Sequence, residues 1–251
     1  LDTTIIFTFH IPVAYDVLIN EIMADPDPPI ALPPYEYIEL YNPNHFPINL
    51  ENWKIRISNT TRIIGNVDID PNGYLILCHQ DGMQDFENLP QHCKTFGFSS
   101  FSITNAGADI VLYSPDGNVI SFAAFRDTWY QDPLKAEGGY SVEMIDPNNP
   151  CADETNWRAT NSLFGGTPGI INSIHGSNPD NDNPEILRAI LQNSTTLLVL
   201  YTEPLDSIYA LDSSNYIIEP LLTINNIKGN EPFYNEITII FNESVDSSEI
   251  Y

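Results

Sequence analysis

Short runs of alternating apolar and polar residues cover most of this chain, and no long stretch repeats its apolar residues with a helical period of 3.6. Alternation with a period of two sends successive side chains to opposite faces of a strand. The pattern therefore predicts an all-β protein. The runs that predict strands in the first two thirds of the chain are residues 17–23, 35–41, 53–57, 73–78, 109–113, 118–122 and 140–145.

The run at residues 35–41 has the clearest alternation. Its apolar residues Ile38 and Leu40 are predicted to face a core, and the residues on the alternate face are Tyr37, Glu39 and Tyr41. The run at residues 17–23 is almost wholly apolar, which is typical of a strand that is covered on both faces.

Two turn sequences, Asp70-Pro-Asn-Gly73 and Ser114-Pro-Asp-Gly117, place proline second and glycine fourth, as a type I turn prefers. The second turn joins residues 109–113 to residues 118–122, which predicts a hairpin. Residues 123–137 are polar, aromatic and irregular, and a loop-rich stretch through residue 169 is expected after the strand at 140–145.

The composition changes at residues 174–184, where Ser, Gly, Asn, Asp and Pro leave almost nothing to bury, so this segment is predicted to be a linker of low burial. Strand-like runs follow it at residues 186–191, 196–203, 216–218 and 235–241. We therefore expect four parts. They are the end of a preceding module with a strand at 4–9 (residues 1–15), a complete β-sandwich (16–173), the linker (174–184) and a second β domain (185–251).

Several phrases recur in a characteristic order along the first part of the chain. They are Asp16-Val-Leu-Ile-Asn-Glu-Ile22, Glu36-Tyr-Ile-Glu-Leu-Tyr-Asn42, Leu50-Glu-Asn-Trp53, Gly138-Gly-Tyr-Ser-Val-Glu-Met-Ile-Asp-Pro147, Asn156-Trp157 and Gly165-Gly-Thr-Pro-Gly169. Their order and spacing over residues 16–173 resemble the lamin tail domain in its bacterial extracellular form. That resemblance implies an immunoglobulin-like β-sandwich that serves as a non-catalytic module.

Two phrases near the end, Leu200-Tyr-Thr-Glu-Pro-Leu205 and Ser213-Ser-Asn-Tyr216, resemble the bacterial immunoglobulin-like modules that occur in tandem on secreted proteins. The stretch that carries them is shorter than the roughly 100 residues of an immunoglobulin-type sandwich, so we expect a partial domain. The start, Leu1-Asp-Thr-Thr, has no initiating Met and no apolar leader, and we expect the chain to be cut from a longer protein.

The charge balance restricts the partners. With 34 acidic and 9 basic residues the formal net charge is −25, so the surface repels phosphate backbones and anionic membranes. We therefore expect no nucleic-acid partner. No run reaches the roughly 18 apolar residues of a membrane span, so no transmembrane segment is predicted. Acidic surfaces suit a salty exterior that is rich in divalent cations.

The linker run Asp180-Asn-Asp-Asn-Pro184 resembles the run that binds calcium between cadherin repeats. Calcium takes six to eight oxygen ligands. The run could supply them from Asp180, Asp182 and Asn183, with Glu21 or Glu203 adding others. The alternative is a plain polar linker that binds no ion.

The chain has three cysteines, Cys78, Cys93 and Cys151, and an odd number forbids a complete disulfide framework. A bridge between Cys78 and Cys93 and a set of buried thiols both remain open. His79 and His92 stand beside these cysteines, but their spacing does not match the usual pairs of zinc ligands.

No glycine-rich phosphate loop, His-Glu-x-x-His pair, nucleophile elbow or Cys-x-x-Cys pair is present. A hydrolase could still use two carboxylates, for which Glu21, Glu36 and Glu39 are the best candidates because they lie in or beside apolar strands. The alternative, which we favour, is that these glutamates accept hydrogen bonds from loops or face solvent. The chain is therefore not expected to be an enzyme.

The aromatic patch of Phe125, Trp129 and Tyr130, flanked by Asp127 and Asp132, is a candidate ligand site. Aromatic faces beside carboxylates can stack on sugar rings and accept hydrogen bonds from their hydroxyls. The alternative is that these rings form the miniature core of their own loop.

Resemblance, acidity and the absence of catalytic motifs together lead to one hypothesis about function. We expect a structural, adhesive or ligand-presenting module of a large secreted or cell-surface bacterial protein, in contact with neighbouring domains of the same chain and with a glycan or a surface protein. The alternative is a carbohydrate- or polymer-binding accessory domain of an extracellular hydrolase.

Overall fold

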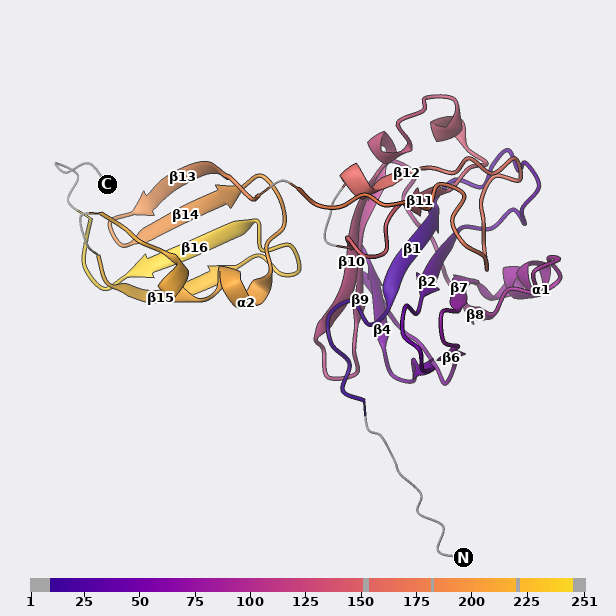
Figure 1. Cartoon of the computed structure of the whole chain (residues 1–251), viewed down its shortest axis with the longest axis horizontal. Coiled ribbons are helices and arrows are strands. Elements are labelled where there is room, and N and C mark those ends of the chain that lie inside the picture. Colours follow the sequence, from indigo (N-terminus) through magenta and orange to yellow (C-terminus); the bar gives the residue numbers. More distant parts are fainter. Residues whose placement is uncertain (1–9, 151–153, 182, 220–221, 246–251) are drawn as a thin grey trace, which may run out of the picture. The chain divides into compact units, whose positions relative to one another are not determined.

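The computed structural model describes residues 10–150, 154–181, 183–219 and 222–245 (Figure 1). The chain divides into two units, the first ending at Pro179 and the second beginning at Asp180. The strand predicted at residues 4–9 and the cysteine Cys151 lie outside the described residues.

The first unit is a sandwich of two sheets. The six-stranded sheet has the order β12-β11-β1-β2-β7-β8, and its strands are β1 (Leu18–Met23), β2 (Tyr37–Tyr41), β7 (Tyr74–His79), β8 (Thr95–Phe98), β11 (Val142–Met144) and β12 (Trp157–Ala159). The four-stranded sheet has the order β10-β9-β4-β5, and its strands are β4 (Lys54–Ile57), β5 (Thr60–Ile63), β9 (Gly107–Tyr113) and β10 (Val119–Arg126). A separate ribbon pairs β3 (Ile48–Asn49) with β6 (Asp68–Ile69).

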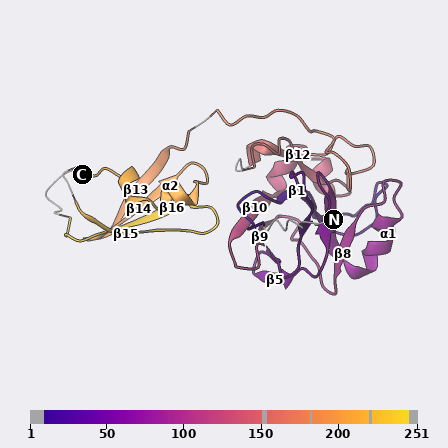
Figure 2. The same ribbon diagram turned by 60° about the horizontal axis from the view of Figure 1, so that its bottom comes forward.

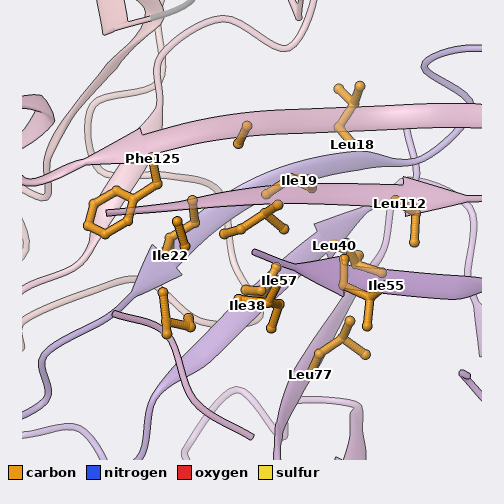
Figure 3. Packing of buried hydrophobic residues seen from close by; sticks show 14 of the residues in the cluster. Leu18, Ile19, Ile22, Ile38, Leu40, Ile55, Ile57, Leu77, Leu112 and Phe125 are labelled. Carbon is orange, nitrogen blue, oxygen red and sulfur yellow. The ribbon is translucent and has the colours of Figure 1, made fainter. Parts of the chain in front are cut away.

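The core lies between the two sheets. The six-stranded sheet contributes Ile22, Ile38 and Leu40, and the four-stranded sheet contributes Ile55 and Leu112, all of them fully buried (Figure 3). Each such side chain adds roughly 1.5–3 kcal/mol to the stability of the fold. The predicted all-β, immunoglobulin-like sandwich is thereby confirmed, including the inward direction of Ile38 and Leu40.

Both predicted turns are present. The amide of Gly73 donates to the carbonyl of Asp70 at 2.9 Å, and the amide of Gly117 donates to the carbonyl of Ser114 at 3.0 Å. The second turn joins β9 to β10, which pair antiparallel along their length, so the predicted hairpin is confirmed.

One prediction in the later part of this unit is wrong, and another is incomplete. Residues 123–126, predicted to be irregular, continue β10, because alternate residues there still turn inward. They are followed by two 3-10 turns, η2 (Asp127–Tyr130) and η3 (Lys135–Glu137). The stretch predicted as a loop-rich exit contains β12, a strand of only 3 residues that is too short to show alternation in the sequence.

The outer face of the six-stranded sheet is also covered, as predicted for residues 17–23: every residue of β1 is buried. Over β2 and β7 this face packs on a short segment of η1 (Gln80–Gly82) and α1 (Met83–Glu87), which lies beside β8 (Figure 2). Cys78 and Cys93 belong to this cluster as free thiols, and burial raises the pKa of each to about 12. Of the two open alternatives the buried thiols are observed, and the bridge between them is not.

The second unit contains one antiparallel sheet in its described part. Its order is β13-β14-β16-β15, and its strands are β13 (Ile186–Asn193), β14 (Thr196–Tyr201), β15 (Ile224–Gly229) and β16 (Glu236–Phe241). The strand predicted at residues 216–218 is wrong, because Tyr216 instead packs on the core of this unit and donates its hydroxyl to the carbonyl of Ala210 at 2.7 Å. The helix α2 (Ser207–Ala210) contributes Ala210 to that core. The strand β15 was missed because its polar residues hide the alternation.

The predicted linker at residues 174–184 is not the only long segment of low burial, because β13 is exposed at all but one of its residues. The first part of the predicted linker is also held by the first unit. The amide of Gly176 donates to the carbonyl of Ile145 at 3.0 Å, and the amide of Asn178 donates to Asp146 Oδ2 at 2.8 Å. The division between the units accordingly falls at Pro179, inside the predicted linker.

A chain that ends at Glu137 should lose cooperative folding, because it lacks β11 and β12 and leaves the edge of β1 unpaired. A matched chain of residues 1–179 keeps both strands and should unfold cooperatively in urea, followed by circular dichroism. Similar unfolding midpoints for the two chains would show that β11 and β12 are dispensable for the sandwich.

Candidate functional site

Three glutamates lie next to one another on the outer face of the six-stranded sheet. Glu39 on β2 and Glu143 on β11 both pair with Glu21 on β1 (Figure 1 shows the three strands), and paired residues of neighbouring antiparallel strands point to the same face. All three have an exposed fraction of 0%. We call them the glutamate row.

The segment of residues 160–178 crosses this face and donates hydrogen bonds to every member of the row. The amide of Gly169 donates to Glu39 Oε2 at 2.6 Å, and the amide of Thr167 donates to Glu21 Oε1 at 2.8 Å. Glu143 Oε2 accepts from the Ser173 hydroxyl at 2.8 Å and from the Ile174 amide at 3.2 Å. The glutamates therefore hold what we call the covering segment against the sheet.

Donors from the sheet itself complete the row. Glu21 Oε1 also accepts from the Tyr37 hydroxyl at 2.7 Å and from the Ser141 hydroxyl at 2.6 Å. Glu39 Oε1 accepts from the side-chain amide of Asn20 at 2.7 Å. Asn20 is the extra residue at a break in the β1–β2 register, and such a bulge redirects a side chain.

Asn172 ties the covering segment to the backbone of the sheet. Its amide nitrogen donates to the carbonyl of Asn20 at 3.0 Å and to the carbonyl of Met144 at 2.8 Å, and its side-chain oxygen accepts from Asn20 at 2.9 Å. Asn172 thus satisfies polar groups of two neighbouring strands that would otherwise be buried without partners.

Two glycines allow the covering segment to come this close. A Cβ atom on Gly166 would lie 2.6 Å from Glu21 Oε1 and 2.6 Å from the Tyr37 hydroxyl. Gly165 has a φ of +94°, a left-handed conformation that other residues rarely adopt. Gly166 is therefore required by the contact with Glu21, and Gly165 by the backbone conformation that precedes it.

Burial dominates the electrostatics of the row. It raises the pKa of Glu21 to about 7, with the charge of Glu143 as the second cause, and the Glu39 pKa lies well above its ordinary value for the same reason, with Glu21 as its charged neighbour. None of the ion pairs among the described residues involves the row. The row is closed to a substrate in this conformation, although Glu21 and Glu39 were the sequence candidates for a carboxylate pair.

The third sequence candidate, Glu36, lies elsewhere, at an open cleft of about 390 Å³. Glu36 is half-buried and accepts from the amide of Ile103 at 3.2 Å; burial raises its pKa and the charge of Asp25 adds to the effect. The cleft is lined by Ala24, Asp25, Pro26, Asp27, Pro34, Tyr35, Glu36, His79, Phe101 and Asn105.

The walls of the cleft are held in place by local contacts. Asp25 Oδ2 accepts from the side-chain amide of Asn105 at 2.6 Å. The ring of Tyr35 lies on Gly82, where a Cβ atom would come within 2.7 Å of it. His79 Nδ1 accepts from the amide of Asp81 at 3.2 Å, which leaves Nε2 to donate to the Ser99 carbonyl at 3.1 Å. Half-buried aromatic carbon, an imidazole, an amide and three carboxylates thus meet at one opening.

The aromatic patch predicted from the sequence is part of the core. Phe125, Trp129 and Tyr130 are at most 4% exposed. Trp129 stacks on Trp157 with ring centroids 5.3 Å apart, and the Tyr130 hydroxyl donates to the carbonyl of Tyr140 at 3.0 Å. None of the three rings offers a free face to a sugar, and all three belong to the main core of the sandwich and not to a separate core of their own loop.

Of the predicted calcium ligands, Asp180 and Asn183 follow the first unit, and Asp182 lies outside the described residues. Within the described part of the chain no group of three or more His, Cys, Asp or Glu side chains is placed to hold a metal ion. Glu21 cannot supply a further ligand, because it is fully buried and already accepts hydrogen bonds from Thr167, Tyr37 and Ser141. Calcium binding in the linker stays a prediction.

The model of the Lamin Tail Domain family matches residues 12–127. No curated protein matches the chain. The matched stretch runs from before β1 to the end of β10 and includes Glu21 and Glu39. Glu143 and the covering segment lie beyond it, although β11 and β12 belong to the same sheet and the first unit runs to Pro179.

No helix among the described residues is long and apolar enough to cross a membrane.

Glu143 was missed as a member of the row, although it alternates with the inward-facing Val142 and Met144. An acidic residue in an alternating strand ordinarily faces solvent, so the sequence held no signal that another segment covers it.

Replacing Asn172 by Ala should lower the free energy of unfolding of the first unit by about 3 kcal/mol, because the buried carbonyls of Asn20 and Met144 and the side-chain amide of Asn20 each lose a hydrogen bond. Asn118→Ala, at an exposed turn position, is the matched control and should change little. All three tryptophans, Trp53, Trp129 and Trp157, lie in this unit, so their fluorescence in urea reports its unfolding alone. Equal stabilities of the two variants would contradict the bridging role of Asn172.

Proposed function

We propose that this chain is a non-catalytic module of a large secreted or cell-surface bacterial protein, in which the first unit is a structural or ligand-presenting domain. One observation carries the proposal. The buried carboxyls whose raised pKa values resemble those of catalytic acids are sealed beneath the covering segment and bonded to groups of their own chain. Their work is to hold the sandwich together.

Composition supports the extracellular part of the proposal. A formal net charge of −25 is tolerable where salt and divalent cations screen carboxylates, and it disfavours nucleic acid and anionic lipid as partners. The bacterial extracellular form of the lamin tail domain and an immunoglobulin-like second unit belong to the same proposal. The partners it implies are neighbouring domains of the same chain and a glycan or surface protein.

A second candidate function, carbohydrate or polymer binding as an accessory domain of an extracellular hydrolase, is favoured by the cleft. Half-buried Tyr35 offers aromatic carbon at its wall, and Glu36, Asp25 and Asn105 offer acceptors and a donor. Sugar rings stack on aromatic faces and bond their hydroxyls to such groups. Because Phe125, Trp129 and Tyr130 are buried, a sugar site is now proposed at the cleft instead.

A panel of bacterial and plant polysaccharides tests both candidates. We expect that the chain releases no reducing ends from any of them, and that any binding is lost in Tyr35→Ala and weakened in Glu36→Gln. Phe164→Ala removes an exposed aromatic ring away from the cleft and is the control, which should bind normally.

Two results would contradict these expectations. Release of reducing ends that Glu36→Gln abolishes without loss of stability would make the chain an enzyme. Binding that survives both cleft variants would place the sugar site elsewhere.

We also propose that Asp180, Asp182 and Asn183 bind calcium in the linker. A single site should then raise the stability of the chain by about 2.7 kcal/mol at a hundredfold excess of calcium over its Kd. The melting temperature should rise in millimolar calcium and stay constant in Asp180→Asn/Asp182→Asn. If the melting temperature of the wild-type chain is the same with and without millimolar calcium, the segment is a plain linker that binds no ion.

A further inference from the structure

We propose that the glutamate row is a proton-dependent latch, which closes the covering segment over the sheet while the row holds a bound proton and releases it when that proton leaves. The latch is a conformational device of the first unit and does not depend on which ligand the chain binds.

The hydroxyl of Thr167 cannot satisfy both of the carboxyl groups between which it lies. Its oxygen lies 2.8 Å from Glu143 Oε1 and 3.3 Å from Glu21 Oε2. A hydroxyl has one hydrogen and can donate it to only one of these carboxyl groups. The other contact is a hydrogen bond only if that carboxyl carries a proton and donates to Thr167. With both carboxyls ionised, Thr167 therefore leaves one of the two facing oxygens, Glu21 Oε2 at the longer distance, without a hydrogen from this hydroxyl.

Repulsion within the row gives that proton its importance. Neighbouring strands are about 4.8 Å apart, so three ionised glutamates on β2, β1 and β11 would bring three negative charges within about 10 Å. The titratable groups of the surrounding elements are Tyr37, Tyr74, Cys93, Lys135, Asp146, Arg158 and His175. Arg158 lies on β12, opposite Glu143 of β11, and its side chain is exposed. No ion pair among the described residues joins Arg158 to the row.

The other two cations of this set are engaged elsewhere. Lys135 donates to the carbonyl of Thr160 at 2.5 Å, at the start of the covering segment. The His175 charge acts on Asp146, near the end of that segment. Three fully buried carboxyls on neighbouring strands, with no ion pair to any of them among the described residues, favour a bound proton, and burial raises the Glu21 pKa to about 7.

The covering segment is the part that can yield when the row becomes charged. The other face of the sheet is the sandwich core, so water can reach the row only from the side of this segment. Several of its large apolar side chains face solvent, with exposed fractions of 89% for Leu163, 65% for Phe164 and 59% for Ile171. Hydrogen bonds hold much of this segment in place, so it can open at a lower free energy than the strands beneath it.

The direction of the pH dependence follows from linkage. Opening returns Glu21 to water and to its ordinary pKa of 4.5, whereas the closed state holds the proton up to about pH 7. Closure is therefore fully stabilised below the ordinary pKa and weakens as the pH rises through the closed-state value. Within that window the opening equilibrium should increase about tenfold for each pH unit.

Amide hydrogen exchange measured on the whole chain between pH 5 and pH 9 tests the latch. Rates are divided by the intrinsic exchange rate at each pH, so that only protection is compared. We expect protection of residues 160–178 to fall about tenfold for each pH unit up to about pH 7, while protection of β9 stays constant.

The variant Glu21→Gln should remove this pH dependence, since a neutral amide replaces the protonated carboxyl and can donate to Thr167. Glu143→Gln is a second variant that removes the other carboxyl at Thr167, and it should flatten the pH dependence if Glu21→Gln does not fold. Glu137→Gln, at an exposed position, is the matched control and should behave as wild type.

Three results would overturn the proposal. They are protection of residues 160–178 that is independent of pH in the wild type, an unchanged pH dependence in both row variants, and a simultaneous loss of protection in β9, which would mean global unfolding.

Discussion

A carboxylate that is removed from water must find hydrogen-bond donors or a proton. Glu21, Glu39 and Glu143 all face this requirement on one face of the six-stranded sheet, and the rest of the first unit depends on how it is met. Glu21 belongs to the first strand, and its donor Thr167 lies 146 residues later. The contact joins the two ends of the unit across its full sequence length. Because the carboxylates need these donors, the covering segment needs Gly165 and Gly166, and the sheet gains a second buried face.

The same requirement accounts for the sequence phrases that mark this domain. Residues of three phrases that are distant in sequence are one another's hydrogen-bond partners. Asn20 donates to Glu39, Thr167 donates to Glu21 and Gly169 donates to Glu39. The family match over residues 12–127 contains the acceptors Glu21 and Glu39 but not the donors of the covering segment. The structure therefore adds to that match a physical reason why the fold does not stop where the match stops.

Local patterns were sufficient to predict the longer alternating strands such as β2 and β9, the turn at Ser114 and the inward direction of Ile38 and Leu40, because each depends on neighbours in the sequence. Burial of Glu143 and of Trp129 could not be predicted in this way. Glu143 is covered by Thr167 to Ile174, which lie 24–31 residues further along the chain. Trp129 is covered by Trp157, which lies 28 residues further along. The predicted aromatic patch failed for that reason: an aromatic cluster beside carboxylates looks alike in a sequence whether or not another ring covers it.

Glu36 and Glu39 show how far such local reasoning can go. They are three residues apart, Glu36 just before β2 and Glu39 at its middle, and both were candidates for chemistry. Glu36 ends in an open cleft with one amide donor, whereas Glu39 is sealed with bonds from Gly169 and Asn20. The carboxyl that can meet a ligand is therefore the one with the less perturbed environment. A strongly raised pKa in this protein marks a group that supports the fold, so accessibility has to be established before a shifted carboxyl is taken as a functional site.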